Sequence, residues 1–389
     1  MISTRIPPHG EINRITRAVE QLRAAGEAFV DLTESNPTSV GIPYPDGLLH
    51  ALADPRALTY APDPLGLWTA REAVAAEFAR RGSRVDPAHL VLSASTSEAY
   101  SWLFKLLCDP GDTVLVPQPS YPLFEHLTRL EGVSTAGYRQ SFHGRWEIDF
   151  GSLADAPART RAVLVVSPNN PTGSFLTRRE LDELIAVCRE RRWTLIVDEV
   201  FADYPVEPPD DTAIDVAADA GVLAFTLGGA SKSAGLPQMK LGWTLVGGPP
   251  AERDAALNAL ELIADTFLSV STPVQVAAPR LLTDGARIRA AILSRVRENL
   301  ATARALAPAH PSCSLLPVEG GWSLIVRVPA TRSEEALVLD LLEHDRVLVH
   351  PGFFFDLPHE AFLVISLLPP PRMFADAFAR VLLQANSLT

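Results

Sequence analysis

The chain has 389 residues, of which 47% are apolar and 21% charged, a balance typical of globular proteins with room for two domains. Its formal net charge of -12, without a long Lys/Arg run, argues against nucleic acid as a partner. The absence of a bilayer-length apolar run or an apolar signal segment predicts neither a membrane span nor export. Cys108, Cys188 and Cys313 lack metal-ligand spacing, so we expect a cytoplasmic protein without a metal site.

The first half of the chain predicts an arm, one helix and then an alternating pattern. The first helix spans 11–25, and a Pro/Gly-rich crossing loop covers 41–47. Further helices are expected at 68–81, 97–107 and 180–191, and short apolar strands at 89–92, 113–117, 162–167, 194–198 and 222–228. Short apolar strands enclosed by helices indicate a mostly parallel sheet covered on both faces. The large domain is therefore predicted to be a doubly wound α/β domain.

The second half of the chain follows a different pattern. Long helices are predicted at 250–264 and 273–307, and then strands at 320–329, 347–352 and 361–368 around a helix at 334–344. Trp322, Leu324, Val326 and Val328 alternate onto one face, as in a half-buried strand. This half predicts a smaller α+β domain. We expect 1–45 to form the arm and part of the small domain, 46–270 the large domain, and 271–389 the small C-terminal domain.

Polar residues follow several of the predicted strands, where open α/β sheets bind their ligands. Ser95 and Glu98 have capping-box spacing, which predicts a helix start directly after the strand at 89–92. Free N–H groups there, with the hydroxyls of Ser95, Thr96 and Ser97, would suit a phosphate. A simple helix cap accounts for the same residues.

Two further strand ends carry an amide-rich loop and a carboxylate. The segment SPNNPTG, 167–173, fixes Asn169 and Asn170 between prolines and a glycine. Asp198 ends an apolar strand, where a carboxylate is costly unless a partner compensates it. A protonated pyridine nitrogen would be such a partner, although a carboxylate that caps the next element is an equally simple interpretation.

The fourth strand end, GGASKSAGLPQMKLGW at 228–243, carries two lysines. In a small-residue loop, a desolvated Lys232 amine would have a lowered pKa and act as a nucleophile. Lys240 could reach an anionic group. The segment does not match a phosphate-binding P-loop, because Lys232 follows Ser231 rather than glycine and the glycine spacing differs. A solvated loop is the alternative, but Trp243 and the flanking apolar strands argue against exposure.

Taken together and in this order, the four elements resemble the aminotransferase class I/II family, the fold-type-I group of pyridoxal-phosphate enzymes. The likeness covers roughly residues 30–385, and its most specific parts are the NPTG loop, the D-E pair and the S-K element. It implies pyridoxal 5'-phosphate as cofactor, held by Lys232 as an imine. Once released, Lys232 would move a proton between the substrate Cα and the cofactor C4′. Asp198 would pair with the pyridine nitrogen, Asn170 would hydrogen-bond the 3-oxygen, and Tyr121 would stack on the ring.

The resemblance also implies a phosphate site and a dimer. The residues implied for the phosphate are Ala94, Ser95, Thr96, Ser231 and Lys240. Tyr60 lies in a Y-x5-G-x4-R pattern with Gly66 and Arg71, and would reach the phosphate of a neighbouring subunit. We therefore expect a homodimer with shared active sites.

Several positions depart from the family pattern. Phe201 stands where the family usually has a tyrosine that donates to the 3-oxygen, and Lys240 replaces an arginine. Val364 stands at the position of the arginine that clamps the substrate carboxylate, and valine cannot hold a carboxylate. Another cation must substitute, or the amine substrate lacks a carboxylate there. The candidates are Arg327, which we place first, and Arg372, His350, Arg5 and Arg14. Near the N-terminus, Ser35 and Asn36 are candidate substrate donors.

The function predicted from the sequence is an aminotransferase that moves an amino group between an amine or amino-acid donor and a keto acid. A lyase, decarboxylase or oxidase that uses the same cofactor is the alternative, because the same lysine, aspartate and phosphate cup would serve each of them. A cofactor-binding protein without catalysis is a remoter alternative, against which the retention of Lys232, Asp198 and Asn170 argues. The sequence does not identify the substrate.

Overall fold

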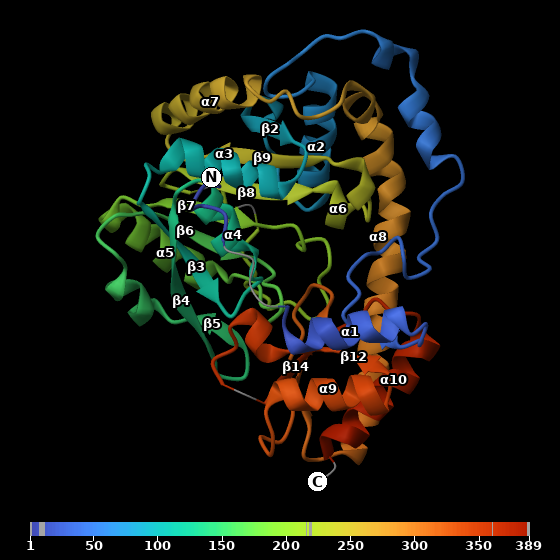
Figure 1. Cartoon of the computed structure of the whole chain (residues 1–389). Coiled ribbons are helices and arrows are strands. Elements are labelled where there is room, and N and C mark those ends of the chain that lie inside the picture. Colours follow the sequence, from blue (N-terminus) through green and yellow to red (C-terminus); the bar gives the residue numbers. More distant parts are fainter. Residues whose placement is uncertain (1, 8–11, 215, 218–219, 360, 387–389) are drawn as a thin grey trace.

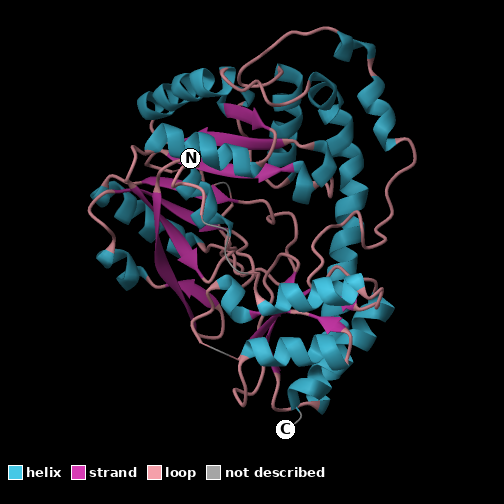
Figure 2. Cartoon of the chain, in the orientation of Figure 1, coloured by secondary structure: helices cyan, strands magenta, loops and turns pink. Residues whose placement is uncertain are grey.

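The molecule has a large sheet wrapped by helices, a smaller antiparallel sheet, and one long helix beside both (Figure 1). The computed structural model describes residues 2–7, 12–214, 216–217, 220–359 and 361–386. Within these ranges every helix is too short or too polar to cross a membrane. Figure 2 shows the two sheets as separate groups of strands, each with its own helical cover.

The large sheet has eight strands among the described residues, in the order β2-β9-β8-β7-β6-β3-β4-β5. Neighbours from β8 through β4 run parallel, whereas β9 is antiparallel to both β2 and β8, and β5 is antiparallel to β4. The strands are β2 (Leu90–Ser93), β3 (Thr113–Gln118), β4 (Ser134–Phe142), β5 (Trp146–Ile148), β6 (Thr160–Val166), β7 (Thr194–Asp198), β8 (Ala224–Gly229) and β9 (Gly242–Gly247).

Alternation along these strands places apolar side chains on both faces of the large sheet. Val91, Leu164 and Ile196 face a core with helices α3, α4 and α7, while Leu92 and Val165 face the opposite core with α2, α5 and α8. Burial on both faces explains why these strands are apolar throughout. The helices are α2 (Trp68–Arg80), α3 (Thr96–Leu107), α4 (Leu123–Leu130), α5 (Arg178–Arg191), α6 (Ala230–Ser233) and α7 (Pro250–Asp265).

A smaller antiparallel sheet, in the order β10-β11-β14-β13, belongs to the smaller domain and is called the small sheet below. The parallel pair β1 and β12 joins the N-terminal segment to this region. Its elements are α1 (Arg14–Ala24), β1 (Val30–Asp31), β10 (Ser314–Leu315), β11 (Ser323–Arg327), α9 (Glu334–His344), β12 (Val347–Leu348), β13 (His350–Pro351), β14 (Phe362–Ser366) and α10 (Pro371–Asn386). The predicted α/β doubly wound domain with a smaller α+β domain is confirmed. Glu11, the predicted start of the first helix, lies outside the described residues.

Short 3-10 helices complete the chain at turns and loop crossings. They are η1 (Leu48–Ala53), η2 (Pro55–Leu58), η3 (Pro87–His89), η4 (Phe150–Asp155), η5 (Pro237–Met239), η6 (Ala307–Ala309) and η7 (Gly352–Phe355).

Helix α8 (Thr272–Leu306) runs beside both sheets and ties them together (Figure 1). In its first half, Arg289 donates to the carbonyl of Ser233 at 2.8 Å and pairs with Glu77 of α2. In its second half, the buried amide of Asn299 donates to the carbonyls of Leu367 and Pro369, both at 2.8 Å. The middle of this helix is thereby fixed to elements that cover the large sheet, and its second half is fixed to the segment that follows β14 of the small sheet.

Candidate active site

A cavity of about 340 Å³ lies where the carboxyl ends of the large-sheet strands meet the small sheet. Val166, Asp198 and Gly229, at the ends of β6, β7 and β8, line one side of it. The opposite wall comes from the small sheet and carries Trp322, Ser323, His350, Val364 and Ser366. A cavity of this size suits a small molecule or cofactor.

Asp198 ends β7 as a buried carboxylate on the floor of the cavity. Its Oδ2 accepts a hydrogen bond from the Tyr100 hydroxyl at 2.7 Å, and its Oδ1 accepts one from the Val200 N–H at 3.0 Å. Burial raises the pKa of the Asp198 carboxyl, while these hydrogen bonds and the charge of Lys232 act in the opposite direction. A cationic partner in the cavity would therefore stabilise the ionised carboxylate.

Lys232 lies on the short helix α6, directly after β8, and its amine points into the same cavity. Its Nζ is 4.7 Å from the centre of the Trp322 ring and 5.4 Å from that of Phe201. Among the described residues no hydrogen-bond acceptor for this amine is found. Burial lowers the pKa of Lys232 to about 8, against the opposing effect of Asp198. The amine is therefore partly neutral near neutral pH, as a nucleophile requires.

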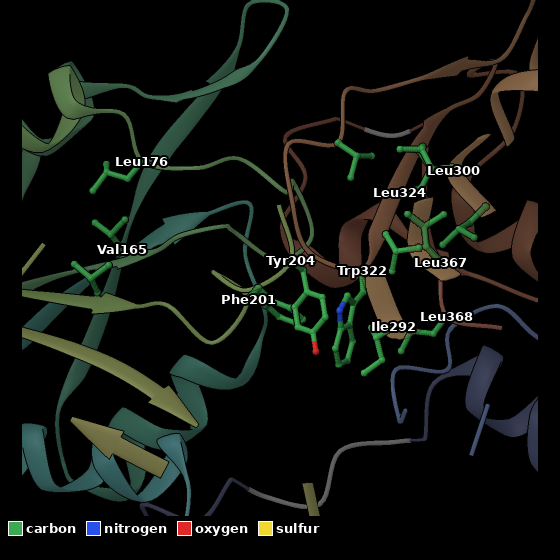
Figure 3. Packing of buried hydrophobic residues seen from close by; sticks show 14 of the residues in the cluster. Val165, Leu176, Phe201, Tyr204, Ile292, Leu300, Trp322, Leu324, Leu367 and Leu368 are labelled. Carbon is green, nitrogen blue, oxygen red and sulfur yellow. The ribbon is translucent and has the colours of Figure 1, made fainter. Parts of the chain in front are cut away.

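Aromatic rings close the cavity between the two sheets. Trp322 packs edge-on against Phe201, with ring centres 5.2 Å apart, and against Tyr204, at 5.0 Å. Figure 3 shows these three rings side by side, with Leu324 of β11, Leu300 of α8 and Leu367, which follows β14, beyond the tryptophan. The Tyr204 hydroxyl donates to the carbonyl of Lys232 at 2.5 Å, so the same cluster fixes the backbone that carries the amine.

The start of helix α3 lies at one end of the cavity, as its sequence predicted. Ser95 is the N-cap and accepts from the N–H of Glu98 at 3.1 Å, while Thr96 and Ser97 line the cavity. The first N–H groups of a helix have no partner within it, so this end favours an anion. Ala94 was expected to help, but its N–H donates to Glu98 Oε2 at 2.7 Å and Ala94 does not line the cavity. Its contact with a phosphate stays a prediction.

Four other residues of the predicted cofactor site line the cavity: Tyr121, Asn170, Phe201 and Ser231. Asn170 Oδ1 accepts a hydrogen bond from Ser323 of the small sheet at 3.3 Å, which links the NPTG loop to the opposite wall. Gly173 of that loop has a φ of 72°, and a Cβ there would lie 2.7 Å from the carbonyl of Gly320. A glycine is therefore required where the loop meets the small domain.

Several candidates lie outside the cavity. Lys240 is exposed, although its neighbour Leu241 lines the cavity. Tyr60 is 74% exposed beside a separate, smaller hollow, and its predicted role toward a second subunit stays a prediction. Asn36 is exposed and accepts from both the N–H and the hydroxyl of Thr38, whereas Ser35 does line the cavity.

No arginine lines this cavity in the described part of the chain. Arg327, our first candidate for the carboxylate clamp, is exposed at the far end of β11, and the structure does not bring it to the cavity. Arg5 donates to the carbonyl of Leu130, Arg14 pairs with Glu335, and Arg372 is exposed. Of the candidate cations only His350 lines the cavity.

Sequence analysis missed Tyr100, Ser323 and Ser366, and assigned Trp322 only to a strand face. Tyr100 follows Thr96 by one helical turn, and that spacing places both side chains on the cavity face of α3. The spacing was a usable signal. The small-sheet residues carried no comparable signal, because their place depends on how the two sheets meet.

Comparisons with known proteins agree with this geometry. The family model for aminotransferase class I and II matches residues 29–374. Alanine aminotransferase of Mycobacterium tuberculosis is 28% identical over 374 residues, covering 93% of this chain and 86% of that protein. Glutamate-pyruvate aminotransferase of Escherichia coli K12 is 26% identical over 365 residues, covering 91% and 90%.

A solved structure described as an alanine aminotransferase from Pyrococcus furiosus shares the fold, with a TM-score of 0.88, 24% identity and 99% coverage of both chains. An aminotransferase from Escherichia coli superposes with a TM-score of 0.87 over 100% of this chain and 99% of that one, also at 24% identity. A match to the family model over this much of the sequence, on a fold shared by solved aminotransferases, confirms the prediction: the chain belongs to the aminotransferase class I and II family.

Proposed function

We propose that this aminotransferase binds pyridoxal 5'-phosphate through Lys232 and exchanges the amino group of an amino acid for the keto group of a keto acid. One observation carries the proposal. A buried amine with its pKa lowered to about 8 and a buried carboxylate, Asp198, face one cavity of about 340 Å³. Surrounding rings shield the amine, and among the described residues no hydrogen-bond acceptor binds it. The amine therefore suits an aldehyde, and the carboxylate suits a basic ring nitrogen of the same ligand.

The residues present fit this cofactor. Asp198 would hold the pyridine nitrogen, because its buried carboxylate gains most from a cationic partner. The helix α3 start, with Ser95 and Thr96, would hold the phosphate together with Ser231. Asn170 would donate to the 3-oxygen through its amide, and Tyr121 would cover one ring face. Lys240, which lies outside the cavity, is not retained in this set.

When bound, pyridoxal phosphate supplies a ring that accepts the electrons left at the substrate Cα when its proton is removed. Lys232 would provide the amine that holds the aldehyde carbon of the cofactor, and its free amine would move the proton between Cα and C4′. Asp198 would hold a proton on the ring nitrogen. Trp322 and Phe201 exclude water from the Lys232 amine, which keeps that amine partly neutral and basic.

The names of the relatives suggest the first substrates to test. We infer that L-glutamate serves as donor and pyruvate as acceptor, and that L-alanine serves as donor in the reverse direction, since the matching relatives are named for these compounds. We also propose a homodimer, to which exposed Tyr60 contributes, in a reducing cytoplasm where Cys108, Cys188 and Cys313 stay free.

The proposal is tested by following the cofactor spectrum of the purified protein. With pyridoxal phosphate the protein should gain visible absorbance, lose it when L-alanine or L-glutamate is added, and regain it with pyruvate. Protein that stays colourless at saturating cofactor would refute the attachment. Release of carbon dioxide, hydrogen peroxide or an eliminated group, without a regenerated keto acid, would favour the decarboxylase, oxidase or lyase alternative.

Tyr100→Phe is expected to move the acid limb of the pH profile upward. The Tyr100 hydroxyl donates to Asp198 at 2.7 Å and lowers the pKa of that carboxyl. Without this bond the pKa rises, so the ionised form is lost earlier as pH falls. A hydrogen bond to a charged group is worth about 1.5–3 kcal/mol and one pKa unit about 1.4 kcal/mol, so the shift should be about one to two pH units in kcat/KM. Tyr138→Phe, which removes a buried hydroxyl bonded to the carbonyl of Leu164, is the matched control and should not move the limb.

Phe201→Tyr should lower the pKa of the visible chromophore of the loaded protein. Phe201 lines the cavity, and a phenol there would add a hydrogen bond that favours the deprotonated form. One added hydrogen bond of about 1 kcal/mol corresponds to a shift of somewhat less than one unit. A spectrophotometric titration measures it. Phe355→Tyr, on the opposite wall, serves as control, and an unchanged midpoint for Phe201→Tyr would remove this interpretation.

A further inference from the structure

The small-sheet wall of the cavity is a short row of paired side chains. In the register of this sheet Val364 of β14 pairs with His350 of β13 on one side and with Ile325 of β11 on the other. Directly opposite residues in antiparallel strands have Cβ atoms about 4.5–5.5 Å apart. His350 and Val364 both line the cavity, so the imidazole stands directly beside the valine.

The His350 ring is positioned by packing and has unused nitrogens. Its ring centre lies 5.9 Å from that of Phe354 and 5.5 Å from that of Phe355, both in tilted or edge contacts. Within the described ranges, neither ring nitrogen has a hydrogen-bond partner. The side chain is partly buried, and burial lowers the pKa of His350, while the carboxylate of Asp31 opposes this shift. Two aromatic contacts thus hold a ring that can still donate.

The hydroxyl groups near this wall already donate hydrogen bonds to other groups. Ser366 donates to the carbonyl of Glu34 at 2.6 Å, and Ser323 donates to Asn170 at 3.3 Å. Thr33, which also lines the cavity, donates to Asp31 at 2.6 Å. A hydroxyl that donates elsewhere can offer an anion only its lone pairs. These three groups therefore cannot bind a carboxylate without breaking an existing hydrogen bond.

The proposed reaction nevertheless requires a group in the cavity that binds the substrate carboxylate. A keto acid carries a carboxylate on the carbon beside its reacting carbonyl, and Lys232 is committed to the reacting carbon. Among the described lining residues the remaining side chain that can bear a positive charge is His350. A carboxylate in a low-dielectric cavity needs such a partner, because burying it unpaired is costly.

We propose that His350 binds the substrate carboxylate and thereby selects carboxylate-bearing substrates. This inference rests on the proposed function, since it assumes a keto-acid substrate in this cavity. Val364 leaves room beside the imidazole for the carboxylate. Burial lowers the pKa of His350, and the charge of Asp31 and that of the bound carboxylate oppose this shift. His350 would therefore set substrate affinity and leave the proton transfer at Lys232 unchanged.

Propionate is a suitable binding probe, because it carries the carboxylate and lacks an amine. Its dissociation constant is measured on cofactor-loaded protein by the change in visible absorbance and by calorimetry. His350→Leu should weaken propionate binding about 10- to 100-fold, the effect expected for a charge-assisted hydrogen bond. His126→Leu, at an exposed position on α4, is the matched control and should bind as the wild type does. Equal affinity in the wild type and His350→Leu, or no binding by the wild type, would overturn the proposal.

A kinetic pair separates carboxylate recognition from general damage to the site. L-alanine and isopropylamine differ only in a carboxylate replaced by a methyl group. His350→Leu should raise KM for L-alanine with little change in kcat, leave isopropylamine unaffected, and be rescued by a second change, Val364→Arg. Equal loss with both amines, or no rescue, would contradict the role. A wild type without visible absorbance at saturating cofactor would instead refute the proposed function.

The pH dependence of propionate binding gives an independent test. Protonated His350 binds the anion, so propionate affinity should fall as pH rises and the imidazole loses its proton. In the part of the chain that the structure describes, the other titratable groups that line this cavity are Asp198, Lys232, Tyr100 and Tyr121, and the charge of Asp31 also acts on His350. They are the same in His350→Leu, so the difference between the two profiles belongs to His350. Parallel profiles would contradict the proposal.

Discussion

Lys232→Ala is expected to reduce transamination on the order of 10²- to 10⁴-fold, the range for loss of a positioned acid–base group. The variant also loses the covalent link, so bound cofactor should wash out and the visible band should resemble free pyridoxal phosphate. The amine occupies the end of a defined element, α6, with its backbone carbonyl fixed by Tyr204, so truncation leaves the surrounding structure in place. Stopped-flow absorbance with L-alanine measures the half-reaction.

The chain offers a sharp control for this change. It contains only three lysines, Lys105, Lys232 and Lys240. Lys105 lies on the outer side of α3 and pairs with Glu131, away from the cavity. Lys105→Ala should leave rate and spectrum unchanged, and small primary amines should partly restore proton transfer to Lys232→Ala. Near-wild-type turnover in Lys232→Ala would contradict the assigned role.

Asp198→Asn should retain the covalent link but lose roughly 10²- to 10³-fold in rate, the usual effect of removing one preorganised charge. The amide keeps the shape of the side chain and can still accept from Tyr100. It cannot hold a positive charge on the ring nitrogen. Visible absorbance should therefore persist while reaction with L-glutamate slows. Cofactor affinity should also fall, because a buried charge pair is lost.

Glu199→Gln is the matched control for this carboxylate. Glu199 is the next residue in the chain, equally buried, and pairs with Arg81 outside the cavity. Its replacement should lower the melting temperature without a selective loss of rate per molecule of bound cofactor. If both variants slow the reaction equally, the effect of Asp198→Asn is structural and the pairing with the ring nitrogen is unsupported.

Strands buried on both faces were the part of the fold that sequence predicted best. The predicted strand at 194–198 coincides with β7, and the helix at 334–344 coincides with α9. These segments are short and uniformly apolar, or strongly capped, so local pattern decides them. Strand β4 was missed because it lies near the sheet edge and mixes polar residues with glycine, which hides the alternation.

Strand β9 was missed for a different reason. Its residues are as apolar as those of β8, but it runs antiparallel between β2 and β8. Its first two residues also fall within the segment 228–243, which was interpreted as a lysine-bearing loop. Helix α4 is only eight residues long, too short for a clear period. Helix α10 has a clear apolar face and was not predicted, although the prolines directly before it are typical of a helix start.

The residues of the candidate site also fall into those that local sequence predicts and those that it does not. Residues that follow large-sheet strands, such as Lys232, Asp198 and Asn170, could be predicted because strand ends converge at one edge. The position of Arg327 could not be predicted. The apolar face of its strand was predicted correctly, but the sequence does not show which end of the strand reaches the cavity. Ser323 begins that strand and reaches the cavity, whereas Arg327 ends it in solvent.

Attachment of the cofactor at Lys232 can be checked at the residue itself, by reduction of the loaded protein followed by peptide mapping. Borohydride converts the C=N bond to a stable amine, and mass spectrometry then locates the added mass. Because the chain has three lysines, the outcomes are few. We expect the adduct on Lys232 at about one per chain. An adduct on Lys105 or Lys240, or none at all in coloured protein, would contradict it.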